Sequence, residues 1–91
     1  MDLRQLAALT AVADAGSFSA AARRLHTVQS NVSTHVARLE RELGATLVDR
    51  STGALTDEGE VAVARARRSH HELEALRDDI KTMLNEVAGP V

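Results

Sequence analysis

Apolar residues recur at the three- and four-residue spacing of an α-helix along the first part of the chain. This pattern predicts a helix over residues 2–15, and we expect Gly16 to end it because glycine readily adopts the left-handed conformation found just after helices. Ser19 is a suitable N-cap for a short second helix over residues 20–25. The first apolar face consists of Leu3, Leu6, Leu9, Val12 and Ala13.

A third helix is predicted from Val28 or Gln29 to Leu43, with Gly44 as its stop. A short polar joint, residues 26–30, separates it from the second helix. Phe18, the only aromatic residue, is expected to anchor the core beneath. The apolar positions of the third helix form one stripe, which predicts that this side faces the core. The stripe consists of Val32, Val36, Leu39 and Leu43.

The periodicity changes after residue 44. Residues 47–48 and 54–55 are apolar and flank a Ser-Thr-Gly turn, which predicts a short two-stranded hairpin. Thr56 is expected to cap a long fourth helix that runs to about Val87 and stops at Gly89-Pro90. The second half of this helix has the alternating three- and four-residue spacing of a coiled coil. That spacing indicates a dimerisation stripe made of Leu73, Leu76, Ile80, Met83 and Val87.

Together these elements predict a mainly α-helical protein with a winged helix-turn-helix architecture. Three helices and a short β-hairpin wing form a domain over residues 1–56. Residues 57–91 form a long linker and dimerisation helix.

Composition narrows the function classes. The chain has 91 residues, which is enough for one small domain. It has no cysteine, which excludes disulfides, thiolate metal sites and cysteine nucleophiles. The lack of cysteine also agrees with a reducing cytoplasm. No apolar run resembles a signal peptide or a membrane span. The formal net charge is −2, but five basic and three acidic residues give +2 over residues 23–50. This local excess favours a nucleic-acid partner only weakly.

The outward side of the third helix carries small polar side chains first and arginines later. Such a helix can enter the major groove of double-stranded DNA, where each base pair presents a distinct pattern of donors and acceptors. We expect base or phosphate contacts from Gln29, Ser30, Ser33 and Thr34. We expect phosphate contacts from Arg23, Arg24, Arg38 and Arg41, and a phosphate or minor-groove contact from Arg50 at the start of the hairpin.

The stretch "MDLRQLAALTAVADAGSFSAAARRLHTVQSNVSTHVARLERELGATLVDR" resembles the N-terminal DNA-binding domain of LysR-type transcriptional regulators. Among the matching pieces are Leu3-Arg4-Gln5-Leu6, Gly16-Ser17-Phe18, Gln29-Ser30 and Glu42-Leu43-Gly44, and the resemblance continues through the long helix. It implies a bacterial transcription regulator whose linker helices pair antiparallel. It also implies a DNA contact from His35 and minor-groove reach from the wing. The segment between Arg50 and Leu55 is shorter than is usual in the family and carries no second basic residue.

These observations lead to the interpretation of a cytoplasmic homodimer without a cofactor or bound metal. It would bind a pseudo-palindromic operator with half-sites about 34 Å apart or a multiple of that distance. The inducer-binding domain of the family is absent from these 91 residues, so the sequence is either a truncated piece or a naturally short protein.

Other interpretations compete with this one. The hydroxyl residues of the third helix fit a solvated surface, and Arg38 and Arg41 fit surface pairing with Glu42. The chain also fits a helical dimerisation module that titrates a full-length partner. A metal enzyme that uses His70 and His71 is a weaker reading, because adjacent side chains diverge around a helix. No Gly-rich phosphate loop is present, which disfavours an enzyme.

Overall fold

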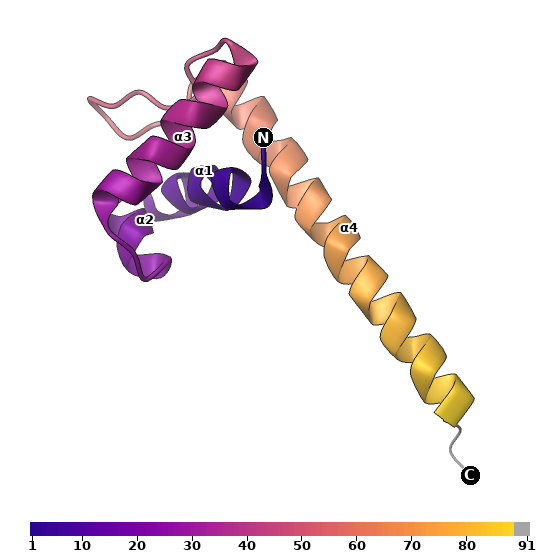
Figure 1. Cartoon of the computed structure of the whole chain (residues 1–91). Helices are drawn as coiled ribbons and strands as arrows, with labels where there is room; N and C mark the ends of the chain where they lie inside the picture. Colours follow the sequence, from indigo (N-terminus) through magenta and orange to yellow (C-terminus); the bar gives the residue numbers. More distant parts are fainter. Residues whose placement is uncertain (89–91) are drawn as a thin grey trace.

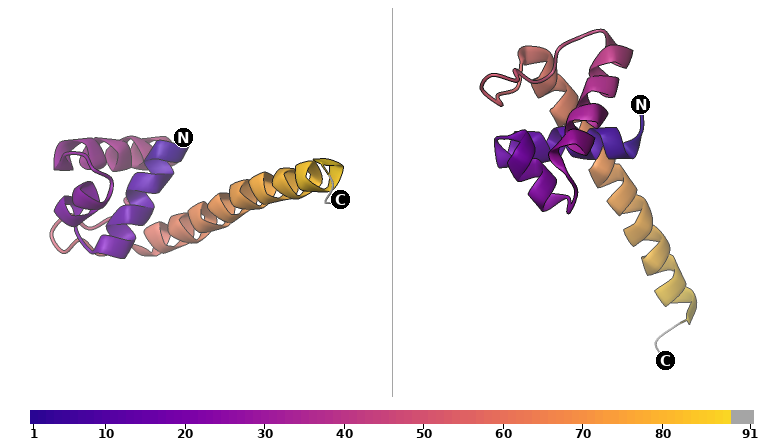
Figure 2. Two further views of the ribbon diagram at one scale, coloured as in Figure 1. Left: turned by 90° about the horizontal axis from the view of Figure 1, so that it is seen from below. Right: turned by 60° about the vertical axis from the view of Figure 1, so that its left-hand side comes forward.

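The computed structural model describes residues 1–88 and has four helices in the order α1 (Leu3–Ala15), α2 (Phe18–Arg24), α3 (Gln29–Leu43) and α4 (Asp57–Ala88). The first three helices pack around one small core, and α4 leaves it as a long arm (Figures 1 and 2). The molecule measures 59 × 25 × 18 Å as a result. The predicted mainly helical architecture with a long final helix is confirmed.

Local signals at the helix ends explain the bounds of α1 and α2. The Asp2 carboxylate accepts a hydrogen bond from the Gln5 backbone N–H at 2.9 Å, and Gly16 ends α1 with a φ of 85°. The cap predicted for α2 was wrong, since Ser17 rather than Ser19 accepts the hydrogen bond from the Ala20 N–H, at 3.1 Å. Beginning α2 one residue after Ser17 brings three residues at helical spacing into the core, namely Phe18, Ala21 and Ala22.

The third helix follows its predicted bounds and buries most of its predicted stripe. Val32, Val36 and Leu39 are buried, and Gly44 ends the helix with a φ of 70°. Leu43 departs from the prediction, because its side chain is 45% exposed. It lies in the last turn of α3, where the helix runs out of the three-helix core.

The predicted hairpin is present as a single antiparallel bridge between Val48 and Leu55. The Asp49 N–H donates to the Ala54 carbonyl at 2.8 Å, and the Thr56 N–H donates to the Leu47 carbonyl at 2.9 Å. The buried Leu47 and Val48 attach this wing to the core. So short a hairpin depends on this packing for its stability.

The fourth helix has two different halves. Thr56 caps it as predicted, accepting a hydrogen bond from the Gly59 N–H at 3.0 Å. Val63 and Ala66 are buried, whereas every side chain from Arg67 through Glu86 is exposed. The side chain of Val87 and the predicted stop at Gly89-Pro90 lie outside the described residues. In the described part of the chain, no helix is both long and apolar enough to cross a membrane.

Candidate nucleic-acid interface

The face of α3 opposite the core is polar and exposed, as predicted. Within residues 1–88, none of its side chains takes part in a side-chain hydrogen bond or an ion pair. Glu42, the expected partner of the arginines on this helix, instead pairs with the N-terminal amino group of Met1. The exposed members of this face are Gln29, Ser30, Thr34, Arg38 and Arg41, and Ser33 beside them is half-buried.

The start of α3 has no side-chain cap. Val28 occupies the N-cap position and cannot accept a hydrogen bond, and the Thr27 hydroxyl accepts from the Asn31 amide at 2.8 Å instead. The first N–H groups of a helix have no partner within the helix, and they carry the positive end of its dipole. Here the Asn31 N–H donates to the Val28 carbonyl at 3.1 Å, whereas the N–H groups of Gln29 and Ser30 have no partner among the described residues and stay available to an outside acceptor. An uncapped helix start is suited to contact an anion such as a DNA phosphate.

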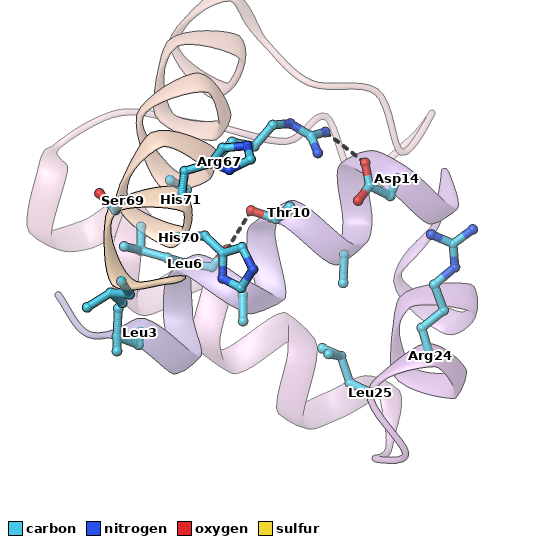
Figure 3. A pocket seen from close by; sticks show the side chains of 14 residues that line it. Leu3, Leu6, Thr10, Asp14, Arg24, Leu25, Arg67, Ser69, His70 and His71 are labelled. Atoms are coloured by element: carbon cyan, nitrogen blue, oxygen red, sulfur yellow. Dashed lines mark hydrogen bonds and ion pairs between the residues drawn. The ribbon is translucent and has the colours of Figure 1, made fainter. Parts of the chain in front are cut away.

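The other side chains that were predicted to contact DNA differ in exposure and position. Arg23 and Arg24 are exposed in the last turn of α2, but Arg24 lies at the edge of a groove between α1 and α4 (Figure 3). His35 is half-buried, and its Nδ1 atom is buried without a hydrogen-bond partner among the described residues. The side chains expected to touch DNA therefore point in more than one direction, and α3 carries the largest continuous set.

Arg50 is held by contacts within the protein. Its guanidinium lies 2.7 Å from the Glu40 carboxylate, donates to the Val48 carbonyl at 3.1 Å, and lies over the Phe18 ring at 5.2 Å. The other contacts of Glu40 also face the wing, because its carboxylate accepts hydrogen bonds from the N–H groups of Leu47 at 2.7 Å and Val48 at 3.3 Å. Arg50 thus joins the wing to α3, and its predicted DNA contact stays a prediction.

The sequence pattern did not predict the contact of Glu40 with the wing. Burial alone would raise the pKa of its carboxyl, but the hydrogen bonds from Arg50 and from the two backbone N–H groups hold that pKa below its ordinary value. Its position beside the buried Leu39 was the available signal, since an acid next to an apolar stripe needs a partner.

The wing itself is short and close to the body of the domain. Gly53 has a φ of 78°, and a Cβ added there would lie 2.5 Å from the Gly16 carbonyl oxygen. The wing turn is therefore packed against the corner between α1 and α2. Residues 51–56 contain no basic side chain, so the wing adds little positive charge beyond Arg50.

A second surface lies along α4. The apolar side chains that the spacing selects are 44 to 59% exposed, and they are Leu73, Leu76, Ile80 and Met83. Leu84, which the sequence reading left out, is 63% exposed and lies on the same part of the helix. Near the domain, this surface continues into the groove between α1 and α4 (Figure 3), whose apolar lining includes Leu3, Leu6, Ala7, Leu25 and Leu73.

One ion pair crosses this groove. An Arg67 nitrogen lies 2.7 Å from the Asp14 carboxylate (Figure 3). The hydrogen bond from Arg67 lowers the pKa of Asp14, and the same contact raises the pKa of Arg67. The His70 Nε2 atom lies 3.7 Å from Glu74, and residues 1–88 contain no group of three or more side chains placed to hold a metal ion.

Comparison with solved structures relates this arrangement to known proteins. The chain is 34% identical to the CbnR DNA-binding domain in a crystal structure of its DNA complex, with a TM-score of 0.85 over 93% of this chain and 100% of that one. It is 33% identical to full-length LysG from Corynebacterium glutamicum, with a TM-score of 0.89 over 94% of this chain and 30% of that one.

Sequence relatives agree with the structural ones. The chain is 41% identical to an uncharacterized HTH-type transcriptional regulator of Azotobacter vinelandii and 36% identical to the HTH-type transcriptional regulator BsdA of Bacillus subtilis. It spans 63% of the length of the first protein and 32% of the second. The sequence pattern of the lysR family of bacterial regulatory helix-turn-helix proteins matches residues 3–60. Since this match covers more than half of the chain, the protein belongs to the LysR family of bacterial helix-turn-helix regulators.

Proposed function

We propose that this protein binds double-stranded DNA in a sequence-specific manner as a homodimer and so regulates transcription. The observation that carries the proposal is the polar face of α3, whose side chains have no partner within the described chain and whose helix start has no side-chain cap. Both features leave donors and acceptors free for a ligand. The CbnR DNA-binding domain, whose structure was solved in a complex with DNA, has the same fold.

The short and the long side chains of α3 have different roles in this proposal. Gln29 and the hydroxyl residues that follow lie at the leading end, where short side chains let the helix backbone approach the base edges of the major groove. Arg38 and Arg41 lie one to two turns further on and reach phosphates, which position the helix without reading sequence. Arg23 lies at the end of α2 and supplies a further phosphate contact.

Dimerisation through α4 supports the second half of the proposal. The exposed apolar stripe, from Leu73 to Met83, covers too much of the helix to be a set of isolated surface residues. Two copies paired along this stripe would present two α3 helices to one face of DNA. A pseudo-palindromic operator follows from that two-fold symmetry.

A selection from random DNA duplexes tests the reading helix. We expect the protein to recover a pseudo-palindrome, with an affinity that falls by about 0.9 log units per log unit of salt for each neutralised phosphate. We predict that Ser33→Glu and Thr34→Glu each abolish binding, because a carboxylate would face the groove.

Thr82→Glu is the matched control, since it adds the same charge on the exposed distal part of α4. Circular dichroism of each variant checks that the fold is kept. If Ser33→Glu and Thr34→Glu bind the selected duplex as well as Thr82→Glu does, α3 is not the reading element.

Sedimentation tests the dimer. We predict that Ile80→Asp converts the protein to a monomer, because it puts a charge into the apolar stripe, and that Thr82→Asp on the neighbouring position leaves the mass unchanged. A protein that dimerises but binds no duplex at any salt would support the second candidate, a helical dimerisation module, which the exposed stripe of α4 also favours. Pairing of that kind would respond to salt far less than DNA binding does.

A further inference from the structure

The attachment of α4 to the rest of the protein is narrow. Among the helices of the described chain, α4 contacts only α1. The buried or partly buried apolar side chains that α4 contributes are small, namely Ala62, Val63 and Ala66, and none after Ala66 is buried in the described part of α4. Small side chains form a smooth surface, with few ridges to fix the angle at which two helices cross. Apolar packing alone therefore constrains the direction of α4 only loosely.

The ion pair between Asp14 and Arg67 lies at the point where α4 leaves the domain. Arg67 is the first residue after the last buried one, and its contact with Asp14 at 2.7 Å is the only ion pair or side-chain hydrogen bond between α4 and another helix of residues 1–88. Figure 3 shows it bridging the two helices across the groove. The pair thus adds a directional contact where the apolar contacts end.

The position of Asp14 on its own helix is unfavourable without this partner. Asp14 lies next to the last residue of α1, where the negative end of the helix dipole disfavours a carboxylate, and the last turn of α1 contains no basic residue. The positive charge of Arg67, which lies 53 residues later in the sequence, offsets this unfavourable interaction between the Asp14 carboxylate and the helix dipole. An acid at this site therefore contributes to the junction with α4 rather than to the stability of α1.

The length of α4 amplifies any change at this junction. Residues 67–86 extend about 30 Å beyond the domain at a rise of about 1.5 Å per residue. A tilt of about 10° at Arg67 therefore moves the far end by about 5 Å, which exceeds the spacing of about 3.4 Å between neighbouring nucleotides of a DNA strand. A contact that is energetically weak can still decide where the domain sits relative to the helix.

We propose that Asp14 and Arg67 are positioning residues that set the angle between the reading domain and α4, and hence the half-site spacing that the protein selects. This inference rests on the proposed dimer, in which the two α4 helices are paired and each domain swings about its own junction. Neither residue touches DNA; both act on the separation of the two α3 helices.

The distance between the two α3 helices can be measured directly, because the chain has no native cysteine. A spin label on Thr34→Cys reports one distance between the protomers of the dimer by pulsed dipolar spectroscopy. We expect Asp14→Asn and Arg67→Gln to shift or broaden this distance by several ångströms, and the exchanged pair Asp14→Arg with Arg67→Asp to restore it.

Glu74→Gln is the matched control, since it removes the same charge and a contact with His70 within α4 but leaves the Asp14–Arg67 pair intact. The free energy of unfolding should fall only slightly in Asp14→Asn, because the ion pair that it removes is partly exposed to solvent. A merely structural role would instead leave the distance unchanged in every variant.

Selection of DNA duplexes provides the functional readout. We expect Asp14→Asn to accept half-sites spaced one base pair more or less than those the unaltered protein selects, while Glu74→Gln keeps the original spacing. Identical distances and spacings in all variants would overturn the positioning role alone. Absence of dipolar coupling between protomers in the labelled Thr34→Cys protein that carries no other change would overturn the proposed dimer, and the positioning role with it.

Discussion

Residues 3–66 and residues 67–86 both contain apolar residues at helical spacing. In the first region these side chains are largely buried, and in the second they are exposed. Every buried side chain of the described chain lies at or before Ala66, and every side chain from Arg67 through Glu86 is exposed. In α3, the stripe through Val32, Val36 and Leu39 meets α1 and is covered by the same chain. In the second half of α4, the equivalent stripe stays exposed, and only Leu73 borders the groove against α1.

The contrast shows what an apolar stripe specifies. Helical spacing of apolar residues predicts that one face of a helix is buried, but it does not predict which molecule covers that face. The domain folds around its own stripe because α1 and α2 return to it through short turns. The second half of α4 projects beyond every other element, so that only another molecule can cover it (Figure 2). We therefore interpret the first region as scaffold and the second as interface.

The largest effect is expected where the start of α4 packs against the wing, within the first region. Gly59 lies in the first turn of α4, and a Cβ added there would overlap with the Leu47 backbone carbonyl. Backbone cannot move aside as a flexible side chain does, so we predict that Gly59→Ala lowers the free energy of unfolding by roughly 4 kcal/mol. Urea unfolding followed by circular dichroism measures it.

Ala64→Ser, on an exposed position of the same helix, is the control for this change. It should alter the free energy of unfolding by no more than about 0.5 kcal/mol. If Gly59→Ala costs as little as the control, α4 is not held against the wing at this point.

The same substitution made in both regions tests the comparison most directly. Leu39 is fully buried and Leu76 is 59% exposed. We predict that Leu39→Ala lowers the free energy of unfolding by roughly 3 kcal/mol at every protein concentration, because it leaves a cavity in the core. Leu76→Ala should instead weaken association and shift the midpoint only where the protein is dimeric.

Unfolding measured over a hundredfold range of protein concentration separates these two effects. A midpoint that does not depend on concentration in the unaltered protein would contradict the assignment of the second region as an interface. An effect of Leu76→Ala as large as that of Leu39→Ala in the monomer would show that α4 contributes to the core after all.

Much of the fold was predictable because its signals are local. Gly16 and Gly44 mark helix ends through their own backbone preference, and the spacing of Val32, Val36 and Leu39 identifies the buried side of α3. The cap of α2 was misplaced because Ser17 and Ser19 are equivalent as local signals. The burial of Phe18, a tertiary contact, selects between them.

The candidate site was less predictable for the same reason. The polar face of α3 follows from its own periodicity, and the structure finds it exposed. Arg50 was expected at DNA because it begins a wing, but its partners Glu40 and Phe18 are distant in sequence and come together only in the folded chain. Spacing along one helix cannot reveal such contacts.

The smallest predicted effect concerns the charged contact that holds the wing within the scaffold region. Glu40→Gln keeps an acceptor for the Leu47 N–H but loses the attraction to Arg50, which is partly exposed to solvent. We predict a loss of about 1 kcal/mol near neutral pH, and Glu42→Gln at an exposed pair should change stability by less than about 0.5 kcal/mol.

The pH dependence of this difference identifies its cause. The pKa of Glu40 is lower in the folded protein than its ordinary value of 4.5, so the unfolded chain binds a proton first as the pH falls. The advantage of the unaltered protein over Glu40→Gln should therefore be complete above that ordinary pKa and should decline as the pH falls through the lower folded value. Urea unfolding of both proteins at pH 7 and at about pH 3 measures this change. A difference that is equal at both values would show that shape, rather than charge, holds the wing to α3.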